Sequence, residues 1–84
     1  MMSSHEINKV FVELVEQYRI KKGISQNKLA TEAGVTAGLL SRIKNGTRKA
    51  PTLDKVWNIA KVLDMPLSQL VANLESRAKE LENE

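Results

Sequence analysis

The sequence is poor in the residues on which most enzyme and metal sites depend. Its 84 residues include no cysteine, a single histidine (His5) and one residue each of tryptophan, tyrosine and phenylalanine. Without thiols or clustered imidazoles the chain has no disulfide, no thiol nucleophile and no zinc-type ligand set. Glycine-rich phosphate-binding loops and nucleophile elbows are missing as well. We therefore expect a protein that is not an enzyme and that uses no cofactor and no metal.

Long apolar stretches are also missing. None approaches the roughly 20 residues that cross a bilayer, and the first residues, MMSSHE, lack the basic head and apolar block of a signal peptide. These features favour a soluble, cytoplasmic protein with no membrane partner. A chain of 84 residues predicts one domain, residues 1–84, with a small core, because so short a chain buries only about 60% of its unfolded surface.

What the sequence does contain is basic charge concentrated in its middle. Residues 17–61 carry ten lysine and arginine side chains against two acidic ones, whereas residues 1–16 and 62–84 are each net acidic. The overall charge of +3 hides this difference. A clustered basic surface can simply be solvated, but on a small domain it favours a polyanionic partner such as nucleic acid.

Apolar residues at helical spacing predict helices along the whole chain and no strands. Capping residues, glycines and prolines place these helices near residues 3–22, 25–33, 36–45, 51–63 and 67–82. Ser3, Ser25 and Thr36 are expected to cap the first three of them. Trp57 is expected to cover the small core, although it could instead be half exposed at a dimer contact.

The last predicted helix carries an apolar seam. Five residues follow the 4-3-4-3 spacing of a coiled coil, and we assign them to dimerisation: Leu67, Val71, Leu74, Ala78 and Leu81. The seam spans only two heptads, fewer than the three or four that identify a coiled coil. The alternative is that Leu67, Leu70 and Val71 complete the core while the tail frays in water.

Residues 25–46 have the features of a helix-turn-helix unit. Two short helices cross at a steep angle in this motif, which requires a small residue where the backbones meet and a residue that tolerates positive φ in the turn. Ala30 and Gly34 meet these two requirements. The inward positions are apolar, as the motif needs: Leu29, Val35, Leu40 and Ile43.

Three segments, ISQNKLATEAGV, LLSRIKNG and KAPTLDKVWNIAKVLDMPLSQL, resemble the lambda-repressor and Cro-like helix-turn-helix proteins over about residues 10–70. The resemblance implies an all-α, compact five-helix bundle whose third helix enters the major groove of double-stranded DNA, usually as a two-fold homodimer. It favours a sequence-specific transcriptional regulator on a palindromic operator. Because some proteins of this fold serve protein contacts, the alternative is an antitoxin or another protein-interaction module with a protein partner.

The resemblance also implies roles for individual residues. Base edges would be read by Thr36, Ala37, Gly38, Ser41 and Arg42. DNA phosphates would be contacted by Gln26, Lys44, Asn45, Arg48 and Lys49. Such phosphate contacts position a protein on the duplex without specifying the sequence.

Ala37 and Gly38 depart from the family pattern, because many members carry glutamine or other polar side chains at these positions. We expect Ala37 to meet a thymine methyl group and Gly38 to let the helix approach the groove closely, which leaves Arg42 to bind guanine. The alternative is that the two small residues merely fit the first turn of the helix.

Lys44 is a second departure. Relatives commonly carry a glutamate there, paired with an arginine of the first helix that corresponds to Arg19. We expect either that Lys44 reaches a DNA phosphate or that an acid such as Glu16 pairs with Arg19.

Overall fold

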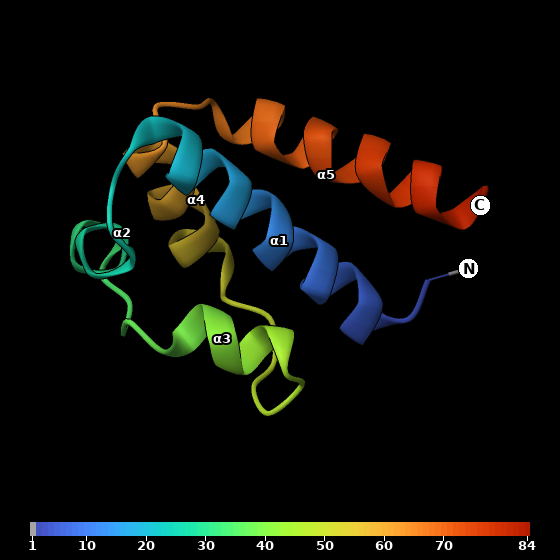
Figure 1. The fold of residues 1–84 in the computed structure, drawn as a ribbon, viewed down its shortest axis with the longest axis horizontal. Coiled ribbons are helices and arrows are strands. Elements are labelled where there is room, and N and C mark those ends of the chain that lie inside the picture. The colour runs from blue at the N-terminus through green and yellow to red at the C-terminus, as the bar shows by residue number, and fades with distance from the viewer. Residues whose placement is uncertain (1) are drawn as a thin grey trace.

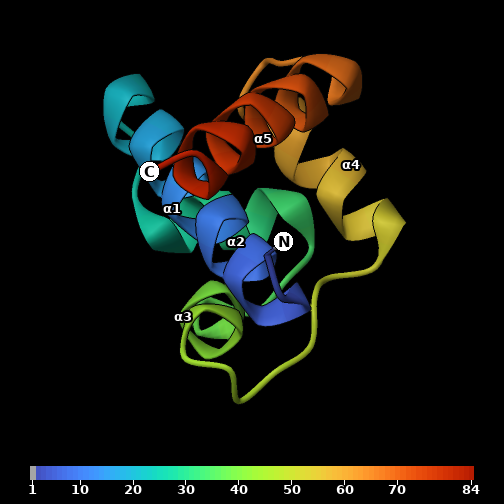
Figure 2. The same cartoon turned by 90° about the vertical axis from the view of Figure 1, so that its right-hand side faces the viewer.

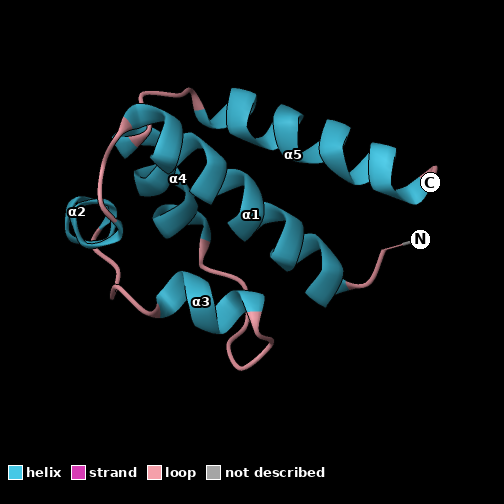
Figure 3. Cartoon of the chain, viewed as in Figure 1, coloured by secondary structure: helices cyan, strands magenta, loops and turns pink. Residues whose placement is uncertain are grey.

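The computed structural model describes residues 2–84, and this part of the chain folds into five α-helices with no strand (Figures 1 and 3). The helices are α1 (Ser4–Lys22), α2 (Gln26–Ala33), α3 (Leu39–Lys44), α4 (Leu53–Val62) and α5 (Leu67–Glu82). The predicted all-α, five-helix architecture is confirmed. The long helix α1 lies between α3 on one side and α5 on the other (Figures 1 and 2).

Local capping explains where the first two helices begin. The Ser3 hydroxyl accepts a hydrogen bond from the Glu6 backbone N–H at 3.1 Å, and Glu6 Oε1 accepts one from the Ser3 N–H at 3.2 Å. The backbone and hydroxyl hydrogen bonds from Ser3 lower the pKa of the Glu6 carboxyl. Ser25 caps α2 in the same manner, its hydroxyl accepting from the Lys28 N–H at 3.0 Å. Both caps agree with the sequence prediction.

The start of α3 differs from the prediction. This helix begins at Leu39, its N-cap is Gly38, and no side chain caps it. The Thr36 carbonyl accepts a hydrogen bond from the Leu39 N–H at 3.1 Å, which makes residues 36–38 a turn. The prediction that Thr36 caps the helix is wrong because its hydroxyl instead accepts from Arg42. Ala37 and Gly38 therefore precede the helix and do not lie in its first turn.

Every helix contributes to a single core. The most deeply buried side chains include one from each helix, in chain order Val15, Leu29, Ile43, Ile59 and Leu70. Burying an aliphatic side chain of this size fully contributes about 1.5–3 kcal/mol to stability. Because Ile43 fixes one side of α3 against the core, the opposite side of α3 faces solvent.

Two further features concern the surface of the bundle. Trp57 does not cover the core as expected, because 57% of its surface is exposed while Ile59 and Ala60 form the buried side of α4.

Within residues 2–84 no helix combines the length and apolar character that a bilayer span requires.

Candidate nucleic-acid interface

The turn between α2 and α3 is fixed from two directions. Gly34 adopts φ 72°, where a side chain would be strained, and the Val35 N–H bonds to the Ala30 carbonyl at 2.9 Å. From α4, Lys55 Nζ donates to the Gly34 carbonyl at 2.9 Å and Asn58 Nδ2 donates to the Ala33 carbonyl at 3.3 Å. These side chains satisfy carbonyls at the C-terminal end of α2 and tie the turn to the bundle. Sequence analysis did not identify Lys55 and Asn58 as supports of the turn.

The five residues assigned to base readout lie together on the turn and on the outer side of α3. Thr36, Ala37, Ser41 and Arg42 are exposed, and Gly38 is half-buried. The neighbouring Leu39 and Ile43 are buried. The segment therefore offers a continuous outer surface held from behind by apolar packing, which suits insertion into a groove.

The Arg42 side chain folds back along α3 toward the turn. Its Nη2 donates to Thr36 Oγ1 at 2.9 Å. A Cβ built on Gly38 would lie only 2.8 Å from Arg42 Nη1, so the guanidinium occupies the space that a side chain at position 38 would need. Gly38 thus leaves room for Arg42 in the free protein.

The residues assigned to phosphate contacts cluster around the same surface. Lys44, Asn45, Arg48 and Lys49 are all exposed, and none of the three cations forms an ion pair within the described residues. The loop that follows α3 bends back, so that Arg48 and Lys49 line one open groove together with Thr36.

The Arg42 carbonyl anchors that loop, accepting from the Thr47 N–H at 3.0 Å, the Thr47 hydroxyl at 3.1 Å and the Arg48 N–H at 3.2 Å. The structure therefore brings the predicted base-reading turn and the basic loop to one side of the molecule.

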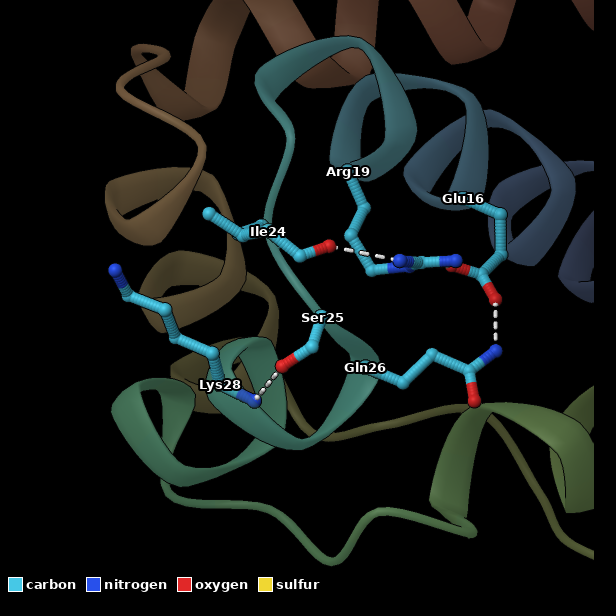
Figure 4. A network of polar contacts seen from close by, with 6 residues as sticks. All are labelled: Glu16, Arg19, Ile24, Ser25, Gln26 and Lys28. Atoms are coloured by element: carbon cyan, nitrogen blue, oxygen red, sulfur yellow. Dashed lines mark hydrogen bonds and ion pairs between the residues drawn. The ribbon is translucent and has the colours of Figure 1, made fainter.

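Glu16 connects the last part of α1 to the start of α2 (Figure 4). Its carboxylate pairs with Arg19 Nε through Oε2 and accepts from Gln26 Nε2 through Oε1 at 2.7 Å. Arg19 Nη1 in turn donates to the Ile24 carbonyl at 2.8 Å. Of the two alternatives that the sequence left for Arg19 and Lys44, the one in which Glu16 pairs with Arg19 is confirmed. Lys44 remains solvent-exposed.

Gln26 is the first residue of α2, and its exposed side chain is held by Glu16. Its second amide N–H and its amide oxygen remain open for a phosphate or water. Sequence analysis did not predict that Glu16 also binds Gln26, because that contact depends on how the end of α1 lies against the start of α2.

His5 lies nearer to this surface than its position in the sequence suggests. A Cβ on Gly46 would be 3.1 Å from His5 Cε1, which places the start of α1 beside the loop after α3. Figure 1 shows the same proximity of the two segments. No sequence signal could have found this contact, because it depends on packing between distant parts of the chain. Residues 2–84 contain no group of three or more potential metal ligands.

The residues assigned to dimerisation have mixed surroundings. Leu67 and Leu74 are partly buried against the protein's own core, and Ala78 and Leu81 are half-buried. Val71 is 50% exposed and, like Trp57, lines a shallow apolar depression between α4 and α5. The assignment to dimerisation stays a prediction.

Comparison with known proteins finds a matching family and several similar proteins. Residues 15–70 match the family model described as helix-turn-helix. The transcriptional regulator SlrR of Bacillus subtilis is 33% identical over 57 residues, which are 68% of this chain and 38% of SlrR. The chain thus spans well under half the length of this relative.

Two solved structures of SinR are also similar. The N-terminal DNA-binding domain of SinR from Bacillus subtilis superposes with a TM-score of 0.63 at 30% identity, covering 75% of this chain and 91% of that domain. SinR in complex with DNA gives a TM-score of 0.62 at 31% identity, covering 73% of this chain and 97% of that one.

Proposed function

Because the chain belongs to the helix-turn-helix family of the Cro/C1 type, we propose that it is a sequence-specific, double-stranded-DNA-binding transcriptional regulator. The observation that carries this proposal is the outer surface of α3 and its preceding turn, flanked by Lys44, Arg48 and Lys49 without acidic partners among residues 2–84. The similarity to SinR, whose structure was solved in complex with DNA, supports it.

In this proposal α3 enters the major groove and its outer side chains meet the base edges. The groove is about 12 Å wide and admits a helix. Arg42 binds guanine O6 and N7, Ser41 reaches a neighbouring base, and Ala37 presents its methyl group to thymine, with Thr36 beside Arg42 on the same surface. Gln26, Asn45 and the loop cations fix the register by holding phosphates.

We propose that the protein acts as a homodimer on a palindromic operator. The exposed apolar side chains Leu53, Trp57 and Val71 on α4 and α5 support a second copy of this chain as the occupant of that surface. Leu67 and Leu74 pack partly against the protein's own core. Val71 is 50% exposed, so among the residues of the predicted seam it has the most apolar surface to offer a second copy. Two copies related by a two-fold axis should hold their α3 helices about 34 Å apart, one turn of DNA.

The same apolar surface is the observation that favours a second candidate function. A protein partner, such as a toxin masked by an antitoxin, could cover Trp57 in place of a second copy. The two candidates differ in their dependence on DNA sequence, which the selection experiment below measures. In either case we expect a cytoplasmic protein without catalytic activity.

Selection from a random library of duplexes tests the proposal, followed by binding measurements on the selected sequence at several salt concentrations. We expect a palindromic consensus. Three charged phosphate contacts in each protomer correspond to about six in the dimer, so the logarithm of the binding constant should fall with the logarithm of salt concentration with a slope of about −5. A failure to enrich any sequence, with binding insensitive to salt, would contradict the proposal.

A further inference from the structure

Thr36 and Arg42 form one structural unit across the turn before α3. Arg42 Nη2 lies 2.9 Å from Thr36 Oγ1, while a Cβ on Gly38 would meet Arg42 Nη1 at 2.8 Å and Cζ at 3.5 Å. The guanidinium is therefore held at one edge by the hydroxyl and rests on the backbone of Gly38. The absence of a side chain at position 38 is what makes this arrangement possible.

The charge of this unit is not neutralised by the protein. Arg42 forms no ion pair with any carboxylate in residues 2–84, and the Thr36 hydroxyl is its hydrogen-bond acceptor. A guanidinium carries five N–H donors, so most of them remain available to an external acceptor. A neutral hydroxyl orients the group and does not compete strongly for its charge, because ionised acceptors bind such donors more tightly.

Arg42 is also the one long polar side chain among the five residues assigned to base readout. Ala37 and Gly38 offer no hydrogen-bonding side chain, and the hydroxyls of Thr36 and Ser41 do not distinguish bases as a fork of parallel N–H donors does. Specificity for guanine therefore depends on how well this guanidinium is oriented before DNA arrives. Pre-orientation lowers the cost of ordering a flexible side chain on binding.

We propose that Thr36 is a positioning residue that holds Arg42 over Gly38 in the orientation used to read guanine, and that Gly38 is small to accommodate Arg42. This inference rests on the proposed DNA-binding function. It is an alternative to the expectation that Gly38 serves close approach of the helix to the groove.

The first test needs no DNA. Side-chain ¹⁵N relaxation of arginine Nε–H groups in the free protein should show Arg42 more ordered than Arg48, which has no side-chain hydrogen bond among residues 2–84. Thr36→Val removes the hydroxyl and keeps the shape, so it should bring Arg42 to the mobility of Arg48. Thr36→Ser keeps the hydroxyl and should preserve the order. An Arg42 as mobile as Arg48 in the unmodified protein would overturn the proposal, whatever the fate of the DNA-binding function.

The second test measures affinity for the selected operator and for variants with each other base at the guanine that Arg42 reads. Thr36→Val should reduce discrimination at that position about 2- to 10-fold, the value of one ordinary hydrogen bond. Thr36→Ser should restore it. Once Arg42→Ala is present, Thr36→Val should have no further effect on discrimination. An equal effect of Thr36→Val with and without Arg42 would show that Thr36 itself contacts DNA and would overturn the proposal.

Gly38→Ala separates the two explanations for the small residue. Its backbone at φ −85° suits alanine, so the fold should survive, which thermal unfolding checks. We expect discrimination at the Arg42 position to fall because the added Cβ displaces the guanidinium. A uniform loss of affinity for all sequences would instead indicate close approach to DNA and would overturn this part of the inference. If the unmodified protein prefers no sequence, the proposed function fails, and the relaxation test still decides the positioning role.

Discussion

Glu16→Gln should destabilise the protein because one carboxylate connects three parts of the chain. Glu16 pairs with Arg19, whose side chain is only 15% exposed, and accepts from Gln26 at the start of α2. Arg19 also donates to the Ile24 carbonyl in the connection between α1 and α2. Glutamine keeps the size of the side chain but loses the charge, and it turns one acceptor into a donor that faces the Arg19 donors.

The magnitude follows from these contacts. Hydrogen bonds to charged groups contribute about 1.5–3 kcal/mol when they are well buried. Because the Glu16 side chain is 27% exposed and water can partly replace the lost acceptor, we expect a loss of about 1–2 kcal/mol in the free energy of unfolding. For a domain of this size that corresponds to a fall in Tm of about 4–16 °C.

The assay is thermal and urea unfolding followed by circular dichroism. Glu13→Gln is the matched control, since Glu13 lies on the same helix, carries the same charge and is exposed without a hydrogen bond or ion pair within the described part of the chain. Arg19→Met in both backgrounds completes a double-mutant cycle and isolates the pair. Equal stability of Glu16→Gln and Glu13→Gln would refute the reasoning, because the pair would then contribute nothing to stability.

Three further predictions concern charge and assembly. Lys49→Ala should weaken binding to all DNA sequences about equally and reduce the salt slope of binding by about one unit for each neutralised phosphate; a loss confined to one operator variant would assign it to base readout. The hydrogen bonds from Ser3 lower the pKa of Glu6, so their stabilisation is present above the ordinary pKa of 4.5 and is lost as the pH falls through the lower folded value. Acid unfolding curves should therefore be less steep in Glu6→Gln, and identical curves would contradict the sign. Trp57→Asp should convert a dimer to monomers in light scattering while the far-ultraviolet circular dichroism stays unchanged, and a dimer that persists would place the interface elsewhere.

The sequence predicted the parts of the fold that depend on neighbouring residues. Ser3 and Ser25 cap helices through hydroxyls that reach backbone groups three residues away, and Gly34 closes α2 through its own φ. Each of these features is decided within a few residues of chain, so a local pattern suffices to predict it.

Features that depend on competition between partners were predicted less well. Thr36 has the chemistry of a cap, but Arg42 takes its hydroxyl, and α3 begins later than expected. Trp57 has the size and hydrophobicity of a core residue, but α4 buries Ile59 and Ala60 and leaves Trp57 57% exposed. The pairing of Arg19 with Glu16 was one of two alternatives: their spacing of three residues on α1 allows the pair, and Arg19 is held there by a further bond to the Ile24 carbonyl that the sequence did not reveal.

The most direct test of the account replaces each guanine of the selected operator, one at a time, by 7-deazaguanine, which removes the N7 acceptor from the major groove only. If α3 lies in that groove and Arg42 binds guanine, one guanine per half-site should become sensitive, with affinity falling about 2- to 10-fold because one bond of the bidentate pair is lost. The Arg42→Ala protein should show no further loss at that guanine. A protein whose affinity is unchanged at every guanine, or an Arg42→Ala variant with the same pattern of sensitivity as the unmodified protein, would contradict the account.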